Sequence, residues 1–305
     1  MMLTDDSTIS QQEAAEIRAE AERLLRDAGA VGLFPTPVDE IMRTAKIQVV
    51  PIALDEGYLA QLRRTAAQAG RALLSALSKV WGVFDPKARV AFVDPETPKE
   101  KLPFLKLHEG GHAILPWQSI FGIFEDCRKT LDPEVKQQFE REANVFASEV
   151  LFQLDGFTRE AADHAFGISV PLRLAKRYGA SVYATVRRYV CQSDKNCAVL
   201  VLNPPELAEI VGFFCSVRRV ITSPEFERRF SNMVWPQTVS ADDALGRLIP
   251  VNRMMGPRTL CLTDSNGDRH EFVAEAFKTP HQVFILINAV AKPARRIILP
   301  ARLAS

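Results

Sequence analysis

The chain has 305 residues, of which 47% are hydrophobic, 8% aromatic and 25% charged. This length corresponds to about two domains, and the composition is that of an ordinary globular protein, which excludes wholesale disorder. The formal net charge is only +1, so electrostatic attraction to nucleic acid or to an acidic membrane is not expected to drive binding.

The start of the chain lacks the features of a targeting segment. Residues 1–10 contain neither the basic region nor the apolar region of a secretory signal. No apolar run is long enough to cross a membrane, and no two of the five cysteines form a C-x-x-C pair. We therefore expect a cytoplasmic protein with reduced thiols and no membrane partner.

The first predicted element is a helix. Ser10 and Glu13 have the spacing of a capping box, and apolar residues recur behind them at helical intervals until Gly29. A proline-led second helix is predicted over residues 36–45. A strand follows at residues 47–51.

The middle of the chain is predominantly helical in pattern. Its predicted elements are a helix over 60–79, a strand over 89–94, a helix that ends at Pro116, a helix over 139–153, and two short helices within 158–190. The helix that ends at Pro116 has two possible starts, at Thr97 or at Pro103.

The pattern changes near residues 191–197, where short β-like runs replace the helices. These runs cover 198–202, 213–221, 259–263, 271–274 and 283–287, with a hairpin turn at 265–267. The chain is therefore predicted to be α+β, with one domain over residues 1–192 and a β-rich second domain over residues 193–305. The second domain carries no motif that assigns it a role.

The chemically informative segment is His108-Glu109-Gly110-Gly111-His112, an H-E-x-x-H motif on a predicted helix. Imidazoles four residues apart lie on one helical face, so both can reach one Zn²⁺ at about 2.0–2.1 Å. Glu109 is then placed to accept a proton from a water molecule that the ion acidifies.

Two structural histidines would be the alternative interpretation of this motif. The adjacent glycines weigh against it, because each glycine inside a helix costs about 1 kcal/mol relative to alanine. Close approach of the backbone to a metal or to a neighbouring helix would account for both glycines.

A catalytic zinc needs a third protein ligand, and no third histidine follows at short spacing. The ligand is expected to be a carboxylate on the next helix, from Glu140, Glu142 or Glu149. Glu142 shares its face with Glu149 and Gln153, which looks wetter than the face of Glu140. Glu140 is therefore preferred and Glu142 remains the alternative, with Asn144 as a residue that could orient the Glu140 carboxylate.

HEGGH, together with EREANVFASEVLF and LAKRYGASVYATVRR, resembles the ImmA/IrrE metallopeptidases over about residues 12–190. The resemblance implies a zincin-like α+β domain with a small mixed or antiparallel sheet and one metal ion. It also implies that His108, His112 and Glu140 are the metal ligands and Glu109 the catalytic acid. Members of this family are linked to the cleavage of helix-turn-helix repressors, in mobile-element or stress regulation.

The sequence therefore predicts a zinc-dependent endopeptidase that acts on a protein substrate, with helix-turn-helix repressors as the class that the resemblance suggests. An extended substrate could pair with the edge of the strand at 89–94. The alternative function is a zinc-stabilised sensor or adaptor without proteolytic activity. No helix-turn-helix is evident, so a fused repressor is not expected, and the balanced charge speaks against direct binding to nucleic acid.

Overall fold

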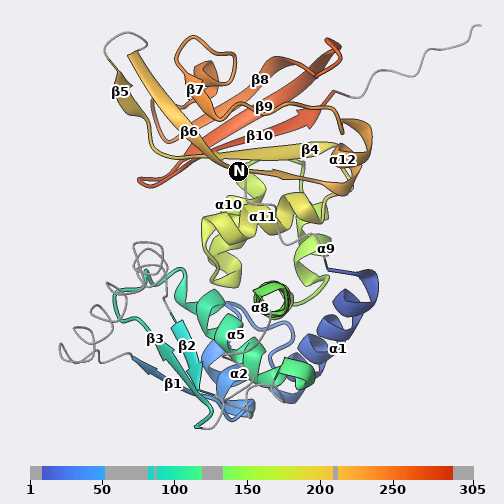
Figure 1. Ribbon diagram of the computed structural model, residues 1–305, viewed down its shortest axis with the longest axis vertical. Helices are drawn as coiled ribbons and strands as arrows, with labels where there is room; N and C mark the ends of the chain where they lie inside the picture. Colours follow the sequence, from blue (N-terminus) through green and yellow to red (C-terminus); the bar gives the residue numbers. More distant parts are fainter. Residues whose placement is uncertain (1–8, 52–81, 86–87, 119–132, 209–211, 291–305) are drawn as a thin grey trace, which may run out of the picture. The chain divides into compact units, whose positions relative to one another are not determined.

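The structure, a computed structural model, describes residues 9–51, 82–85, 88–118, 133–208 and 212–290. The helix predicted over 60–79 lies outside these residues. The chain divides into two compact units, Met1–Tyr189 and Val190–Ser305, and each is described by itself (Figure 1).

The first unit combines helices with a three-stranded mixed sheet. Its elements are α1 (Gln11–Asp27), α2 (Val38–Thr44), β1 (Gln48–Pro51), β2 (Gly82–Asp85), β3 (Val90–Val93), α5 (Leu102–Ile114), α8 (Pro133–Leu151), α9 (Gly156–Ala162) and α10 (Ser169–Tyr178), and α11 (Val182–Cys191) crosses into the second unit. β1 is parallel and β2 antiparallel to β3, which confirms the small mixed sheet of the predicted α+β fold. Because β3 lies between β1 and β2, both its edges are paired. Strand addition at residues 89–94 was therefore a wrong prediction.

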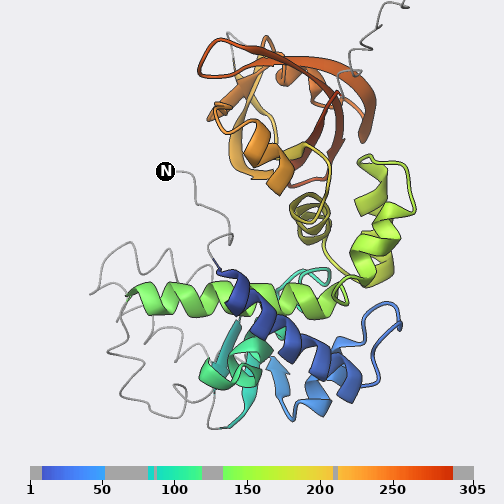
Figure 2. The ribbon, with the colours of Figure 1, turned by 90° about the vertical axis from the view of Figure 1, so that its right-hand side faces the viewer.

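Local sequence signals explain where the first helices begin. Ser10 and Glu13 form the predicted capping box, with Glu13 N donating to Ser10 Oγ at 3.2 Å and Ser10 N donating to Glu13 Oε2 at 2.8 Å. The apolar face of α1 is buried, and α1 packs against α8 (Figure 2). α2 begins at Val38, two residues later than predicted, because Pro37 has a ψ of 69° and lies outside the helical region.

The remaining helices follow the predicted pattern with altered boundaries. α5 begins at Leu102 and places Pro103 in its first turn, which is the later of the two predicted starts. α8 begins at Pro133, six residues before the predicted start at 139. Residues 156–191 contain three helices rather than two, because Gly179 at a φ of +69° ends α10 before α11 begins.

The second unit is the predicted β-rich part of the chain. Its elements are β4 (Cys197–Leu202), β5 (Glu206–Ala208), β6 (Gly212–Thr222), α12 (Pro224–Arg229), β7 (Thr238–Ser240), the 3₁₀ helix η1 (Gly246–Leu248), β8 (Met254–Thr263), β9 (Arg269–Lys278) and β10 (Val283–Ala289). The sheet order is β5-β6-β4-β10-β9-β8, with β7 beside β6, and all the pairings are antiparallel. Figure 2 shows that this sheet is strongly curved.

The five β-like runs predicted after residue 197 all lie in strands of this unit. The predicted hairpin joins β8 to β9, with Gly267 at a φ of +86°. The short strands β5 and β7 and the helix α12 were not predicted. Phe226 of α12 nevertheless enters the core, where its ring lies 5.9 Å from that of Phe272. Among the described helices of the chain, none combines the length and the apolar character that a membrane span requires.

The cysteines of the second unit differ sharply in their environment. Cys197 is fully buried, and burial raises the pKa of its thiol to about 11, whereas Cys261 is exposed. Because the thiolate is the reactive form, we expect iodoacetamide at pH 8 to modify Cys261 in the folded protein and Cys197 only after denaturation. Mass spectrometry of the modified peptides checks this, and equal labelling of both thiols in the folded state would contradict the burial of β4.

Candidate metal centre

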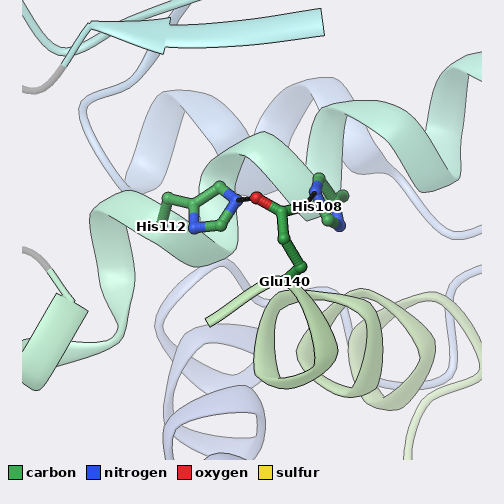
Figure 3. A group of neighbouring side chains, drawn as sticks. All are labelled: His108, His112 and Glu140. Carbon is green, nitrogen blue, oxygen red and sulfur yellow. Dashed lines mark ion pairs between the residues drawn. The ribbon is translucent and has the colours of Figure 1, made fainter. Parts of the chain in front are cut away.

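Two helices bring together the three side chains of the centre. His108 and His112 lie one turn apart on α5, and Glu140 reaches from α8 to place its carboxylate between the two imidazoles (Figure 3). The Nε2 atoms of His108 and His112 lie 3.2 and 3.6 Å from the Glu140 oxygens Oε2 and Oε1. One ligand atom from each of the three residues lies within 4.8 Å of the others.

This spacing fits a small divalent cation. Ligands at about 2.0–2.1 Å in tetrahedral geometry lie about 3.3 Å from one another, which is close to the two distances between the histidine nitrogens and the Glu140 oxygens. The two histidine side chains are only 13% and 14% exposed, whereas the Glu140 side chain is 62% exposed. The donor set therefore consists of two largely buried rings and one exposed carboxylate.

The electrostatics of His108 reflect the nearby acids. Burial of the His108 ring lowers its pKa, but the hydrogen bond to Glu140 and the charges of Glu109 and Glu140 outweigh burial and hold that pKa above its usual range. Asn144, one turn after Glu140, contributes in the same direction. Asn144 thus acts on His108, whereas the role predicted for it, to orient the Glu140 carboxylate, stays a prediction.

Glu109 lies next to these residues without joining the three-residue group. It is only 6% exposed, and its negative charge acts on His108. The proton-accepting role predicted for Glu109 stays a prediction.

Glu142 occupies a different position from the one that its sequence pattern suggests. It is only 4% exposed, and it accepts hydrogen bonds from Trp117 Nε1 at 2.7 Å, Gln118 Nε2 at 2.6 Å and Gln138 Nε2 at 3.2 Å. Gln118 in turn contacts His112, with 2.7 Å between Gln118 Oε1 and His112 Nδ1. Glu142 is therefore linked to the centre through Gln118, which contacts His112.

The burial of α8 contradicts the expectation that the face of Glu142 is wetter than that of Glu140. Glu142, Glu149 and Gln153, expected to form the wetter face of α8, are all buried, and Glu140 is the exposed residue. These buried polar groups form hydrogen bonds with partners far away in the sequence. Arg188 donates to Glu149, and Gln153 donates to the carbonyl oxygen of Leu33.

The two glycines of the motif permit close packing of neighbouring helices. A Cβ at Gly111 would lie 3.3 Å from the Ala143 Cα and 3.2 Å from the Phe146 ring on α8. A Cβ at Gly110 would lie 3.0 Å from the sulfur of Met42, which is near the end of a flexible side chain. Of the two explanations for these glycines, helix packing is the one that the contacts support.

We expect Gly111→Ala to destabilise the first unit by about 1–3 kcal/mol and to weaken metal binding, because it pushes α8 and Glu140 away from α5. Gly110→Ala is the matched control, because Met42 can move and alanine favours the helix by about 1 kcal/mol. Thermal unfolding and zinc titration of both variants check this. Equal behaviour of the two variants would contradict the role of the α5–α8 contact.

Comparison with known proteins gives this part of the chain a family. Residues 76–189 match the model of the Peptidase_M78 family, described as an IrrE N-terminal-like domain. The chain contains a Peptidase_M78 domain. The resemblance to the ImmA/IrrE metallopeptidases is thereby confirmed over residues 76–189, and the three ligand candidates and Glu109 all lie within this domain.

The other comparisons bear on the fold. A solved structure titled "Mycobacterium tuberculosis transcriptional regulator" is similar, with a TM-score of 0.50 and 14% sequence identity over 90% of this chain and 87% of that chain. At this identity the similarity shows a shared fold. No curated protein sequence matches the chain.

Proposed function

We propose that the protein is a zinc-dependent endopeptidase that hydrolyses peptide bonds in a protein substrate. The observation that carries this proposal is the convergence of His108, His112 and Glu140 on one solvent-accessible position inside a Peptidase_M78 domain. Three protein ligands with an open side are the arrangement typical of catalytic zinc, whereas structural zinc sites are closed by four ligands.

Each residue has a defined task in this proposal. His108 and His112 offer Nε2 atoms and Glu140 a carboxylate oxygen, and a zinc ion held there would polarise the scissile carbonyl and acidify water. Glu109 accepts the proton of the attacking water and delivers it to the leaving amine. Its burial strengthens its interaction with charge that develops at the centre, since the local dielectric is low.

The resemblance to ImmA/IrrE metallopeptidases suggests helix-turn-helix repressors as the substrate class, and we propose a cytoplasmic role in relieving repression. The similar solved structure is titled a transcriptional regulator, which favours a regulatory setting. That title also supports the second candidate, a metal-stabilised sensor or adaptor whose second unit binds a partner. In that alternative, the bound metal holds the fold together and the protein does not hydrolyse peptide bonds.

The proposal is tested by incubating the zinc-loaded protein with a proteome-derived peptide library and with purified helix-turn-helix repressors. New N-termini are identified by mass spectrometry. We expect cleavage that disappears on treatment with a chelator and returns when zinc is added. Products that are unchanged after metal removal would contradict a metallopeptidase, and zinc binding without any products would favour the adaptor.

A further inference from the structure

We propose that Gln118 is a positioning residue that fixes the proton of His112 on Nδ1, and that Glu142 anchors Gln118 in the required orientation. The inference rests on the proposed metal-binding function and concerns how the chain prepares one of its ligands. It assigns a role to two buried polar residues that neither hold the metal nor perform the chemistry.

The orientation of the Gln118 amide follows from its partners. One end of the amide lies 3.1 Å from the carbonyl oxygen of Phe139, which can only accept a hydrogen bond. The same end lies 2.6 Å from Glu142 Oε2, an oxygen that already accepts from the indole N–H of Trp117. This end must therefore be the NH₂ group, so the amide oxygen faces His112.

The orientation of the amide determines the state of the histidine. Because the Gln118 oxygen accepts, His112 Nδ1 must donate across the 2.7 Å contact and carry a proton. The neutral ring then keeps its lone pair on Nε2, the atom that faces Glu140. A ligand with its lone pair fixed in advance loses less freedom when it binds the metal.

The Nδ1 atoms of the two histidines differ in their hydrogen-bond partners. His108 Nδ1 is buried and has no hydrogen-bond partner among the described residues, whereas His112 Nδ1 is bound to a glutamine that is itself 4% exposed. α8 supplies both Glu140 and Glu142. A single helix thus contributes one ligand directly and orients a second ligand through Gln118.

The matched pair of variants is Gln118→Met and Gln138→Met. Both glutamines donate to Glu142, but only Gln118 contacts His112. We expect Gln118→Met to weaken zinc binding by a factor of about 10–100, as measured by competition with a chromogenic chelator. Gln138→Met should leave the affinity unchanged. Circular dichroism and thermal unfolding of the metal-free proteins separate this effect from loss of fold.

The contacts that lead from Glu142 through Gln118 to His112, called the relay below, also predict the effect of changing Glu142. Glu142→Gln should lower the affinity of the otherwise unchanged protein, because a neutral amide oxygen accepts the Gln118 hydrogen bond less strongly than a carboxylate does and holds Gln118 less firmly. In the Gln118→Met background the same change should have no further effect on zinc affinity, since Glu142 acts through Gln118. Additive losses of affinity would overturn the relay.

A measurement on the unaltered sequence is independent of whether the variants fold. Nitrogen-15 NMR of the metal-free protein at alkaline pH, with the His112 signals assigned by the His112→Ala variant, should show the Nδ1–H tautomer. The Nε2–H tautomer would overturn the inference, as would equal zinc affinities of the wild type and Gln118→Met. Failure of the wild type to bind zinc above the level of His112→Ala would instead contradict the proposed function.

Discussion

Glu109→Gln is expected to reduce peptide-bond hydrolysis by a factor of about 10²–10⁴. The amide has the same shape as the carboxylate, so the buried position of Glu109 and the fold should be preserved. The amide cannot accept the proton of the attacking water, and this step is the one that the substitution removes. The rate is measured on the peptides or repressor cleaved by the wild type, with zinc content determined in parallel.

The matched control for this experiment is Glu142→Gln, the same chemical change at another buried carboxylate in the same domain. Because Glu142 acts on metal affinity through Gln118, saturation with zinc should restore the activity of Glu142→Gln. It should not restore that of Glu109→Gln. Undiminished cleavage by zinc-loaded Glu109→Gln would remove Glu109 from the mechanism.

Arg188→Leu is expected to destabilise the first unit by about 3–5 kcal/mol, because it leaves the buried Glu149 without its closest cationic partner. Arg188 Nη1 and Nη2 lie 2.5 and 3.3 Å from the Glu149 carboxylate, and Nη2 also donates to the Leu154 carbonyl oxygen at 2.8 Å. Arg18 lies 3.5 Å from Glu149 and replaces only part of this interaction. Urea unfolding monitored by circular dichroism measures the loss, with the two units analysed as separate transitions.

Two comparisons make the ion-pair prediction specific. The double change Glu149→Leu with Arg188→Leu should recover much of the lost stability, since it leaves no unpaired buried charge. Arg43→Leu breaks an exposed pair with Glu40, and it should cost less than about 1 kcal/mol. A double variant as unstable as Arg188→Leu alone would show that the loss comes from packing rather than from the buried charge.

The sequence predicted those features that depend on local pattern. The capping box at Ser10, the strands β4, β6, β8, β9 and β10 of the second unit, and the helix that carries His108 and His112 follow from short-range spacing. Glu140 was placed beside the histidines, but by an argument about helical faces that burial contradicts.

Long-range contacts explain what the sequence could not predict. Glu142, Glu149 and Gln153 look like a solvated face because their partners lie in other elements, and only the folded chain brings those partners to them. Gln118 likewise carries no signal in the sequence that marks it as a partner of His112. Its importance appears only when α5 and α8 are packed together.

The most direct measurement of the central claim is the zinc content of the purified protein, loaded with zinc and freed of excess metal, beside that of His112→Ala. The account predicts one tightly bound zinc ion per wild-type chain and none in the variant, with both proteins folded by circular dichroism. A wild type that retains no zinc, or a variant that retains as much as the wild type, would contradict a metal centre built from His108, His112 and Glu140.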